Sequence, residues 1–234
     1  MIWAMMTTKH PLFSIITITK DNPRGFARTK QSVEDQTFKN YEWIVIDGNK
    51  EPDTGIYNAM NKGLTRANGQ YLVFLNGGDA YATPDTLDMV SHQIEVRAAD
   101  FLYGDVIEGL HYKKAKSCKK FAKGMITSHQ SMFYKREALN GLQFNENRKI
   151  AGDYEFTCAF LKQVKSVFYM PFAITSVETG GISEQLQSVG RREEWAVRRT
   201  ILKKNVLSCM MIYFRQCMAA MVRKAFPPLF YAAR

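Results

Sequence analysis

Three short apolar runs in the first third of the chain are separated by polar segments. Phe13–Thr19 and Glu42–Ile46 are rich in β-branched residues, and Tyr71–Leu75 is apolar throughout. Such runs are typical of buried strands. Between the first two, residues 24–35 are predicted to form a helix. Strand, helix and strand joined by short loops make a βαβ unit, so we predict a parallel sheet with a right-handed crossover.

The remaining pattern extends the same plan. Helices are predicted at 55–64, 84–96 and 153–163, and strands at 101–106, 131–134, 167–170 and 173–177. Thr83-Pro84 supplies an N-cap and a first-turn proline for the second of these helices. The lysine-rich stretch 113–123 is expected to be a surface loop or a short strand. We predict one α/β domain over residues 1–185, with a mainly parallel central sheet flanked by helices, followed by a helical tail over residues 186–234.

Polar side chains end the first three predicted strands. Thr19, Asp47 and Asp79 would all lie at the carboxyl ends of parallel strands, where α/β sheets bind ligands. The third strand ends in Asn76-Gly77-Gly78-Asp79. Its glycines let the backbone approach a bulky anion, and the oxygens of Asn76 and Asp79 suit Mg²⁺ or Mn²⁺. The alternative is an ordinary turn with a solvated aspartate.

Composition is that of a globular protein, with 46% hydrophobic and 23% charged residues. The formal net charge of +10 is concentrated at the end of the chain, where ten Lys or Arg and only two Glu lie between Arg191 and Arg234. Four widely separated cysteines argue against a zinc site or a disulfide framework and favour a reducing, cytoplasmic compartment. The N-terminus lacks the pattern of a signal peptide. No apolar run reaches the roughly 18 residues that a spanning helix requires.

The tail combines basic and apolar segments. Basic pairs at 191/192, 198/199 and 203/204 precede two nearly continuous apolar pieces at 206–214 and 217–222. Basic amphipathic helices with aromatic residues suit the surface of an anionic membrane, here its inner face. Packing on the catalytic domain or on a second subunit is the alternative. Nucleic-acid binding is not expected, because basic and aromatic residues are not interleaved outside the tail.

Seven motifs occur in a fixed order between Phe13 and Ser183. They are Ser14–Thr19, Trp43–Gly48, Glu51–Gly63, Phe74–Asp79, Ser128–Phe133, Ala151–Glu155 and Gly180–Ser183. In this order and spacing they resemble the inverting family 2 glycosyltransferases with the GT-A fold, specifically bacterial enzymes that build surface polysaccharides. The resemblance implies a GT-A fold and transfer of a sugar from a nucleoside diphosphate sugar.

The resemblance assigns the nucleotide-sugar donor to the ends of the first strands. Thr19 and Asp47 would bind the nucleoside, since a carboxylate can accept the imide N–H of uracil or a ribose hydroxyl; Asp47 as a simple turn cap is the alternative. Asp53 and Lys62 match further donor contacts, and a cation suits phosphates. A solvated helix face explains Lys62 equally well. Ser183 would contact a phosphate from a segment that closes over the donor, with a plain loop as the alternative.

The same resemblance assigns metal and catalytic roles. The metal motif of the family is usually Asp-x-Asp, but here Asn76 and Asp79 provide only one acid, so diphosphate oxygens would supply the missing ligands. Asp153 matches the catalytic base, at a helix start whose dipole favours the ionised form; an ordinary N-cap would look the same, and Glu155 is the rival base. His129 matches a His-Gln pair that would contact the donor phosphates, the metal or the sugar. A structural histidine is the alternative.

One segment departs from the family pattern. Between Gly48 and Glu51 the family has another helix and strand, so this chain has either a deletion or, as we favour, an omitted segment. We expect a Mg²⁺- or Mn²⁺-dependent transferase that uses a UDP-sugar and a lipid-linked saccharide acceptor at the inner membrane face. Assembly into a homo-oligomer is left open. The alternative is a catalytically inactive nucleotide-binding or membrane-docking protein of the same fold. A Rossmann dehydrogenase is excluded, because no G-x-G-x-x-G follows the first strand.

Overall fold

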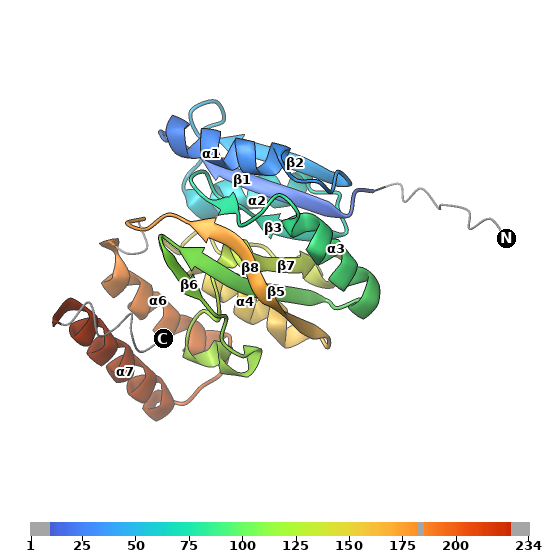
Figure 1. Cartoon of the computed structure of the whole chain (residues 1–234). Helices are drawn as coiled ribbons and strands as arrows, with labels where there is room; N and C mark the ends of the chain where they lie inside the picture. Colours follow the sequence, from blue (N-terminus) through green and yellow to red (C-terminus); the bar gives the residue numbers. More distant parts are fainter. Residues whose placement is uncertain (1–9, 182–184, 226–234) are drawn as a thin grey trace.

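The central sheet is mixed, with most of its strands parallel. In the computed structural model, which describes residues 10–181 and 185–225, the strand order is β2-β1-β3-β7-β5-β8-β4, with β6 paired to β5 (Figure 1). The strands are β1 (Phe13–Thr19), β2 (Tyr41–Asp47), β3 (Tyr71–Phe74), β4 (Ala80–Tyr81), β5 (Phe101–Glu108), β6 (His111–Lys113), β7 (Met132–Lys135) and β8 (Val167–Val177). The pairs β1·β2, β1·β3 and β5·β8 are parallel, whereas β4, β6 and β7 pair antiparallel with their neighbours. The prediction of a mainly parallel sheet is confirmed.

The helices cover both faces of this sheet. They are α1 (Pro23–Glu34), α2 (Ile56–Arg66), α3 (Thr86–Arg97), α4 (Gly152–Gln163), α6 (Gln187–Thr200) and α7 (Val206–Ala225), with short 3-10 turns η1 (Cys118–Lys123), η2 (His129–Ser131) and η3 (Arg136–Leu139). Successive strand residues point to opposite faces. Val73 therefore packs in the cluster that includes Val33 of α1 and Val90 of α3, and Leu72 in the cluster that includes Met60 of α2. Phe156 and Phe160 of α4 complete the second cluster.

Local chemistry sets the starts of α1 and α3, and the start of α3 differs from expectation. α1 begins one residue before its predicted start, where Asn22 accepts a hydrogen bond from Gly25 N (3.0 Å) and Pro23 occupies the first turn. α3 does not use Thr83 as its N-cap: the cap position is Asp85, whose side chain makes no capping hydrogen bond. Thr83 N instead donates to the Thr86 hydroxyl (3.1 Å), which holds the preceding turn.

The two late strands predicted at 167–170 and 173–177 are one strand. β8 runs through both, and its pairing with β5 jumps from Gly104↔Met170 to Asp105↔Ala173. Pro171 lies in this jump, and because proline has no N–H to donate, a bulge is where a strand tolerates it. The lysine-rich stretch 113–123 is irregular, with the end of β6 and the 3-10 turn η1.

The connection after β2 is a tight turn. Lys50 N (2.9 Å) and Glu51 N (2.8 Å) both donate to Asp47 O, and the chain passes from β2 to α2 through loop residues alone. The fold therefore accommodates the short connection without the helix and strand that the family resemblance leads one to expect there.

The last two helices pack differently. α6 is built into the globular unit, since its Val197 is fully buried with Tyr154 and Cys158 of α4. α7 lies beside α6, further from the sheet (Figure 1). The prediction that a catalytic domain ends at residue 185 and a separate tail follows it stays a prediction. Within the described ranges, no helix combines the length and apolarity needed to cross a bilayer.

Candidate active site

One edge of the sheet gathers the predicted site residues. β1, β2 and β3 are parallel and in register, so Thr19 lies opposite Asp47, and the turn after β3 follows at the same edge. β7 runs antiparallel to β3, so its first residues start at this edge. His129, three residues before β7, is brought to Asn76 for this reason.

Side chains of α1 hold the Asn76–Asp79 turn. The Thr29 hydroxyl donates to Asp79 O (2.6 Å) and accepts from Gly78 N (3.0 Å). The Arg28 guanidinium donates to Gly78 O (2.5 Å) and to the Ser176 hydroxyl of β8 (2.9 Å). Gly78 has φ +117°, a conformation that favours glycine. The turn is therefore a built feature that fixes where the Asp79 carboxylate points.

The Asp79 carboxylate is buried and hydrogen-bonded. Its Oδ2 accepts from Gln130 Nε2 (2.5 Å) and its Oδ1 from Glu178 N (3.3 Å). Burial raises the pKa of this carboxyl above its ordinary value, against the opposing effects of the Gln130 hydrogen bond and the nearby His129 and Arg28. The alternative of a solvated aspartate in an ordinary turn is wrong, since Asp79 is only 8% exposed.

His129 links the Asp79 turn to Asp153. Its Nε2 lies 3.1 Å from Asn76 Nδ2, and its Nδ1 lies 3.4 Å from Asp153 Oδ2. With Asn76 donating to Nε2, the proton of a neutral imidazole is on Nδ1, the ring nitrogen nearer the carboxylate. His129 therefore lies between Asn76 and Asp153, where it can position the Asp153 carboxylate.

Asp153 lies in the first turn of α4 and is not its N-cap. The N-cap is Ala151, and the loop before the helix is held from α6, where the Glu193 carboxylate accepts from the N–H groups of Lys149, Ile150 and Ala151 at 2.8 to 2.9 Å. The rival Glu155 is engaged elsewhere, with Arg148 Nε 2.5 Å from its Oε2.

A large cavity joins these groups. It has a volume of about 1180 Å³, and Asn76, Asp79, His129 and Asp153 all line it. Six basic residues also line it: Lys116, Lys120 and Lys123 in and just before η1, Lys149, Arg191 of α6 and Arg215 of α7. Glu108, Glu178 and Glu194 line it as well, so the cavity carries charges of both signs.

The predicted nucleoside residues Thr19 and Asp47 lie at the ends of β1 and β2, and neither lines the cavity. Asp47 Oδ1 accepts from Asn49 N (3.0 Å), and its Oδ2 lies 3.4 Å from Lys50 Nζ, so it does cap its own turn. Asp53 reaches the same place, since its Oδ2 lies 2.7 Å from where a Cβ on Gly48 would stand. Thr19 lies against Gly77 in the same way, with its hydroxyl 2.8 Å from a Cβ built there.

Lys62, like Thr19, Asp47 and Asp53, is not among the described residues that line the cavity. Lys62 donates to Pro52 O (2.7 Å) and lies 3.5 Å from Glu51, so its ammonium group is held in the loop after β2. Ser183 lies outside the described residues. Gly180 and Gly181, just before it, line the cavity. The donor-binding roles of Lys62 and Ser183 stay predictions.

The donor set fits a divalent cation in part. Asn76 Oδ1 is buried and has no hydrogen-bond partner in the described structure, which leaves it available as a ligand. Asp79 offers a carboxylate beside it. Among the described residues no three His, Cys, Asp or Glu side chains are grouped to hold a metal, so two protein oxygens would need further oxygens from a bound diphosphate.

Sequence reasoning missed the residues that support the site. Arg28, Gln130 and Glu193 act through their side chains and Glu178 through its backbone N–H, and each hydrogen bond spans 42 or more residues of sequence. Gln130, next to His129 in a quoted motif, was the one with a visible signal. The others carry no local pattern that distinguishes them from surface residues.

Comparisons with known proteins find glycosyltransferases among similar sequences. No protein-family model matches the chain. A PGL/p-HBAD biosynthesis glycosyltransferase of Mycobacterium tuberculosis is 26% identical over 206 residues, covering 75% of this chain and 80% of the relative. An uncharacterized glycosyltransferase of the same organism is 29% identical over 179 residues, covering 64% of this chain and 68% of the relative.

Solved structures give the same result for the fold. TarS 1-349 of S. aureus has a TM-score of 0.65 at 16% identity, covering 91% of this chain and 73% of the neighbour. The structure of its complex with UDP-GlcNAc has a TM-score of 0.65 at 16% identity, and the match covers 86% of this chain and 70% of the neighbour. A mannosyltransferase from Pyrobaculum calidifontis, in complex with GDP-Man and Mn²⁺, has a TM-score of 0.62 at 13% identity, covering 85% and 66%. The GT-A fold is therefore confirmed, and the chain is similar to glycosyltransferases in sequence and in fold.

Proposed function

We propose that the chain is an inverting family 2 glycosyltransferase that moves a sugar from a nucleoside diphosphate sugar, in particular a UDP-sugar, to a hydroxyl of a glycan acceptor. The observation that carries the proposal is the line of contacts Asn76–His129–Asp153 along one cavity, because it brings the proposed diphosphate-binding turn close to the proposed base. The UDP-GlcNAc complex of TarS supports the donor class.

Donor binding uses the ends of the first strands. The Asp47 and Asp53 carboxylates near Gly48 can accept hydrogen bonds from a uracil imide or ribose hydroxyls, and Thr19 lies beside Gly77 where the diphosphate turn begins. The diphosphate then lies along Asn76–Asp79. A Mg²⁺ or Mn²⁺ held there by Asp79 and Asn76 Oδ1, together with diphosphate oxygens, would stabilise the negative charge of the departing nucleoside diphosphate.

Asp153 is the proposed general base. Its Oδ2 takes the proton of the acceptor hydroxyl while that oxygen forms its bond to the anomeric carbon. The bond from the anomeric carbon to the diphosphate oxygen breaks on the opposite face, and its electron pair leaves with the nucleoside diphosphate, so the configuration inverts. His129, whose Nδ1 lies 3.4 Å from Asp153 Oδ2, would position this carboxylate.

Exchange of the base tests this assignment. Asp153→Asn keeps the shape of the side chain but cannot accept the proton, so transfer is expected to fall by about 10²- to 10⁴-fold with nucleotide binding unchanged. Glu155→Gln is the matched control, because Glu155 pairs with Arg148 and does not line the cavity. Transfer that survives in Asp153→Asn but is lost in Glu155→Gln would refute the role of Asp153.

A second candidate function has a specific observation in its favour. The diphosphate turn carries one acid, and among the described residues no larger group of metal ligands surrounds it. A nucleotide-binding protein of the same fold that has lost catalysis would show the same feature. Nucleotide-dependent thermal stabilisation without turnover, across a panel of donors and acceptors, would identify it.

The acceptor and location are also proposals. We propose a lipid-linked saccharide acceptor in polysaccharide biosynthesis and a place on the cytoplasmic face of the membrane. The six basic residues that line the cavity support an acceptor with anionic groups, since phosphates bind lysine and arginine.

A further inference from the structure

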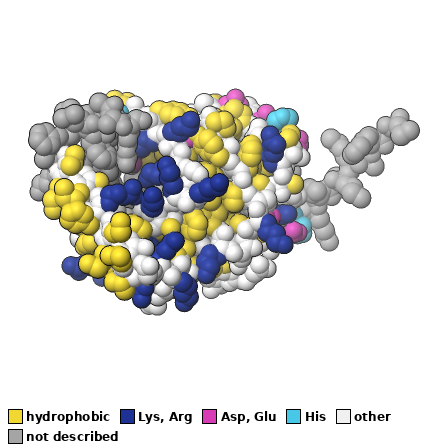
Figure 2. All heavy atoms as spheres, turned by 90° about the horizontal axis from the view of Figure 1, so that it is seen from below, with side chains coloured by type: hydrophobic (Ala, Val, Ile, Leu, Met, Phe, Trp, Pro, Cys, Tyr) yellow, Lys and Arg dark blue, Asp and Glu magenta, His cyan; other side chains and the backbone are white. Residues whose placement is uncertain are grey.

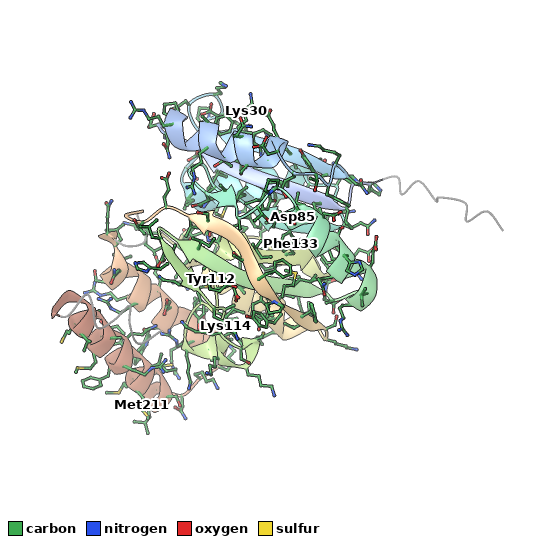
Figure 3. All side chains as sticks on the ribbon, in the orientation of Figure 1. Lys30, Asp85, Tyr112, Lys114, Phe133 and Met211 are labelled. Carbon is green, nitrogen blue, oxygen red and sulfur yellow. The ribbon has the colours of Figure 1, made fainter. Side chains whose placement is uncertain are left out.

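The outer face of α7 is apolar and exposed. It carries Leu207, Met210, Met211, Phe214, Met218 and Met221, which follow one another at helical spacing along one side. Leu207, Met211 and Phe214 are 67 to 68% exposed. Figure 3 shows the side chain of Met211 projecting from the outer side of the helix. Within 206–222 the only charged residue is Arg215. We call this surface the α7 outer face.

The opposite side of α7 is fixed to the body of the protein. Cys209 is fully buried, and Gln216 donates to the Glu194 carboxylate of α6 (2.6 Å). Ala220 lines the cavity. Positions 209, 216 and 220 are spaced at i, i+7 and i+11, so they share one side of the helix, about half a turn from Phe214. The apolar face is therefore held outward by packing on its other side.

A basic segment lies beside this helix. Residues 113–123 contain six lysines and no acid. Gln216 Nε2 lies 3.5 Å from Lys123 O, which ties the end of this segment to α7. Exposed Lys203 and Lys204 precede the helix. Figure 2 shows hydrophobic side chains at one end of this side of the molecule, next to a group of Lys and Arg.

We propose that the α7 outer face and the 113–123 segment together dock on an anionic lipid bilayer, with α7 lying in the plane of the interface. Basic residues beside an apolar helical face are the pattern that binds anionic lipids, whose headgroups neutralise the lysines while the acyl region receives the apolar side chains. A second copy of the chain is a poorer occupant, because an isologous contact sets each patch against itself and brings two lysine-rich segments together.

Docking would also orient the cavity. Arg215, Gln216 and Ala220 of α7 and Lys120 and Lys123 of the basic segment all line it. The elements that meet the bilayer are thus walls of the cavity, so an acceptor carried by a lipid would reach Asp153 without leaving the membrane surface. This consequence rests on the proposed function, whereas the docking itself does not.

Vesicle binding tests the docking surface. The full chain is mixed with phosphatidylcholine vesicles, with or without a third of phosphatidylglycerol, and the bound fraction is measured by flotation. Binding is expected with the anionic vesicles, weaker at high salt. Met211→Glu and Phe214→Glu should each weaken it about tenfold or more, the factor for exchanging one large apolar anchor for a charge. Val96→Glu on α3 is the matched control, since Val96 is an equally exposed apolar residue outside the docking surface (59%).

Each outcome decides the proposal. Loss of binding in the two α7 variants with normal binding of Val96→Glu supports it. Absence of binding by the unaltered chain, or equal binding by all variants, overturns it. A dimer in sedimentation velocity that Phe214→Glu dissociates, with vesicle binding intact, assigns the face to a second copy instead. Asp153→Asn should bind vesicles normally, so a failure of docking and a failure of the proposed catalysis are distinguishable.

Discussion

Replacing Glu193 tests whether α6 holds the loop that presents the catalytic carboxylate. Glu193 is on α6, in the C-terminal part of the chain, but its two oxygens accept from three consecutive backbone N–H groups, those of Lys149 (2.8 Å), Ile150 (2.9 Å) and Ala151 (2.8 Å). These groups precede α4 and have no other capping side chain. In Glu193→Ala all three donors lose their partner, and the loop before Asp153 is released.

The size of the effect follows from these three bonds. A hydrogen bond to a charged group contributes about 1.5–3 kcal/mol, and this carboxylate is only partly buried, so water replaces part of the loss. We expect Glu193→Ala to lower the free energy of unfolding by about 2–4 kcal/mol. For a domain of this size, that corresponds to a fall in Tm of about 5–10 °C. Glu193→Gln keeps one acceptor oxygen, so its free energy of unfolding should fall by about half as much as that of Glu193→Ala.

The same carboxylate predicts a pH dependence. Burial acts to raise the pKa of Glu193, but the three backbone hydrogen bonds and nearby Arg148 outweigh it and hold the pKa below the ordinary value of 4.5. A group with a lowered pKa in the folded state stabilises the fold above its unfolded-state pKa, and the contribution is lost as the pH falls through the folded-state pKa. The stability difference between the unaltered chain and Glu193→Gln should therefore be full at pH 7 and shrink below about pH 4.5.

Urea unfolding followed by circular dichroism, at neutral and acid pH, measures both quantities. Glu95→Ala on α3 is the control, because Glu95 is an exposed helical glutamate whose side chain forms no hydrogen bond or ion pair with any described residue. Transfer should fall in Glu193→Ala while nucleotide binding persists, since the donor turn lies elsewhere. If Glu193→Ala unfolds at the same urea concentration as Glu95→Ala, the inference that α6 holds this loop is wrong.

Three further changes test separate features. Gly152→Ala should lower the free energy of unfolding by about 1–3 kcal/mol, and so lower Tm, because the new Cβ would stand 2.6 Å from the Tyr57 ring. Gly181→Ala is the control and should leave Tm unchanged, because a Cβ at Gly181 has no atom within 4 Å. Asn76→Asp should tighten Mn²⁺ binding without nucleotide in calorimetry, because it adds a charge at a buried oxygen that has no partner; an unchanged affinity would exclude Asn76 as a ligand. Phe156→Ala should lower the free energy of unfolding, measured in urea, by about 3–5 kcal/mol. The buried Phe156 ring stacks on the Phe144 ring with 4.1 Å between their centroids, so a loss under about 1 kcal/mol would contradict that packing.

Local sequence determined the elements and the edge at which they meet. Apolar runs such as Phe13–Thr19 and Tyr71–Phe74 are strands in the structure, because buried parallel strands require apolar side chains on both faces. Polar residues directly after such strands must meet at one edge, so the position of Asn76 and Asp79 beside Thr19 followed from strand order alone.

Only the tertiary structure decided which side chains touch. His129 and Asp153 are 24 residues apart on different elements, and they meet because β7 runs antiparallel while α4 starts at the same edge. Glu155, two residues from Asp153, turns to Arg148 instead, since neighbouring positions on a helix point in different directions. Periodicity showed that α7 is apolar, but packing of Cys209 against the body decided which side faces outward. Contacts of this kind depend on where distant segments cross, and that information lies in the whole chain rather than in any one stretch.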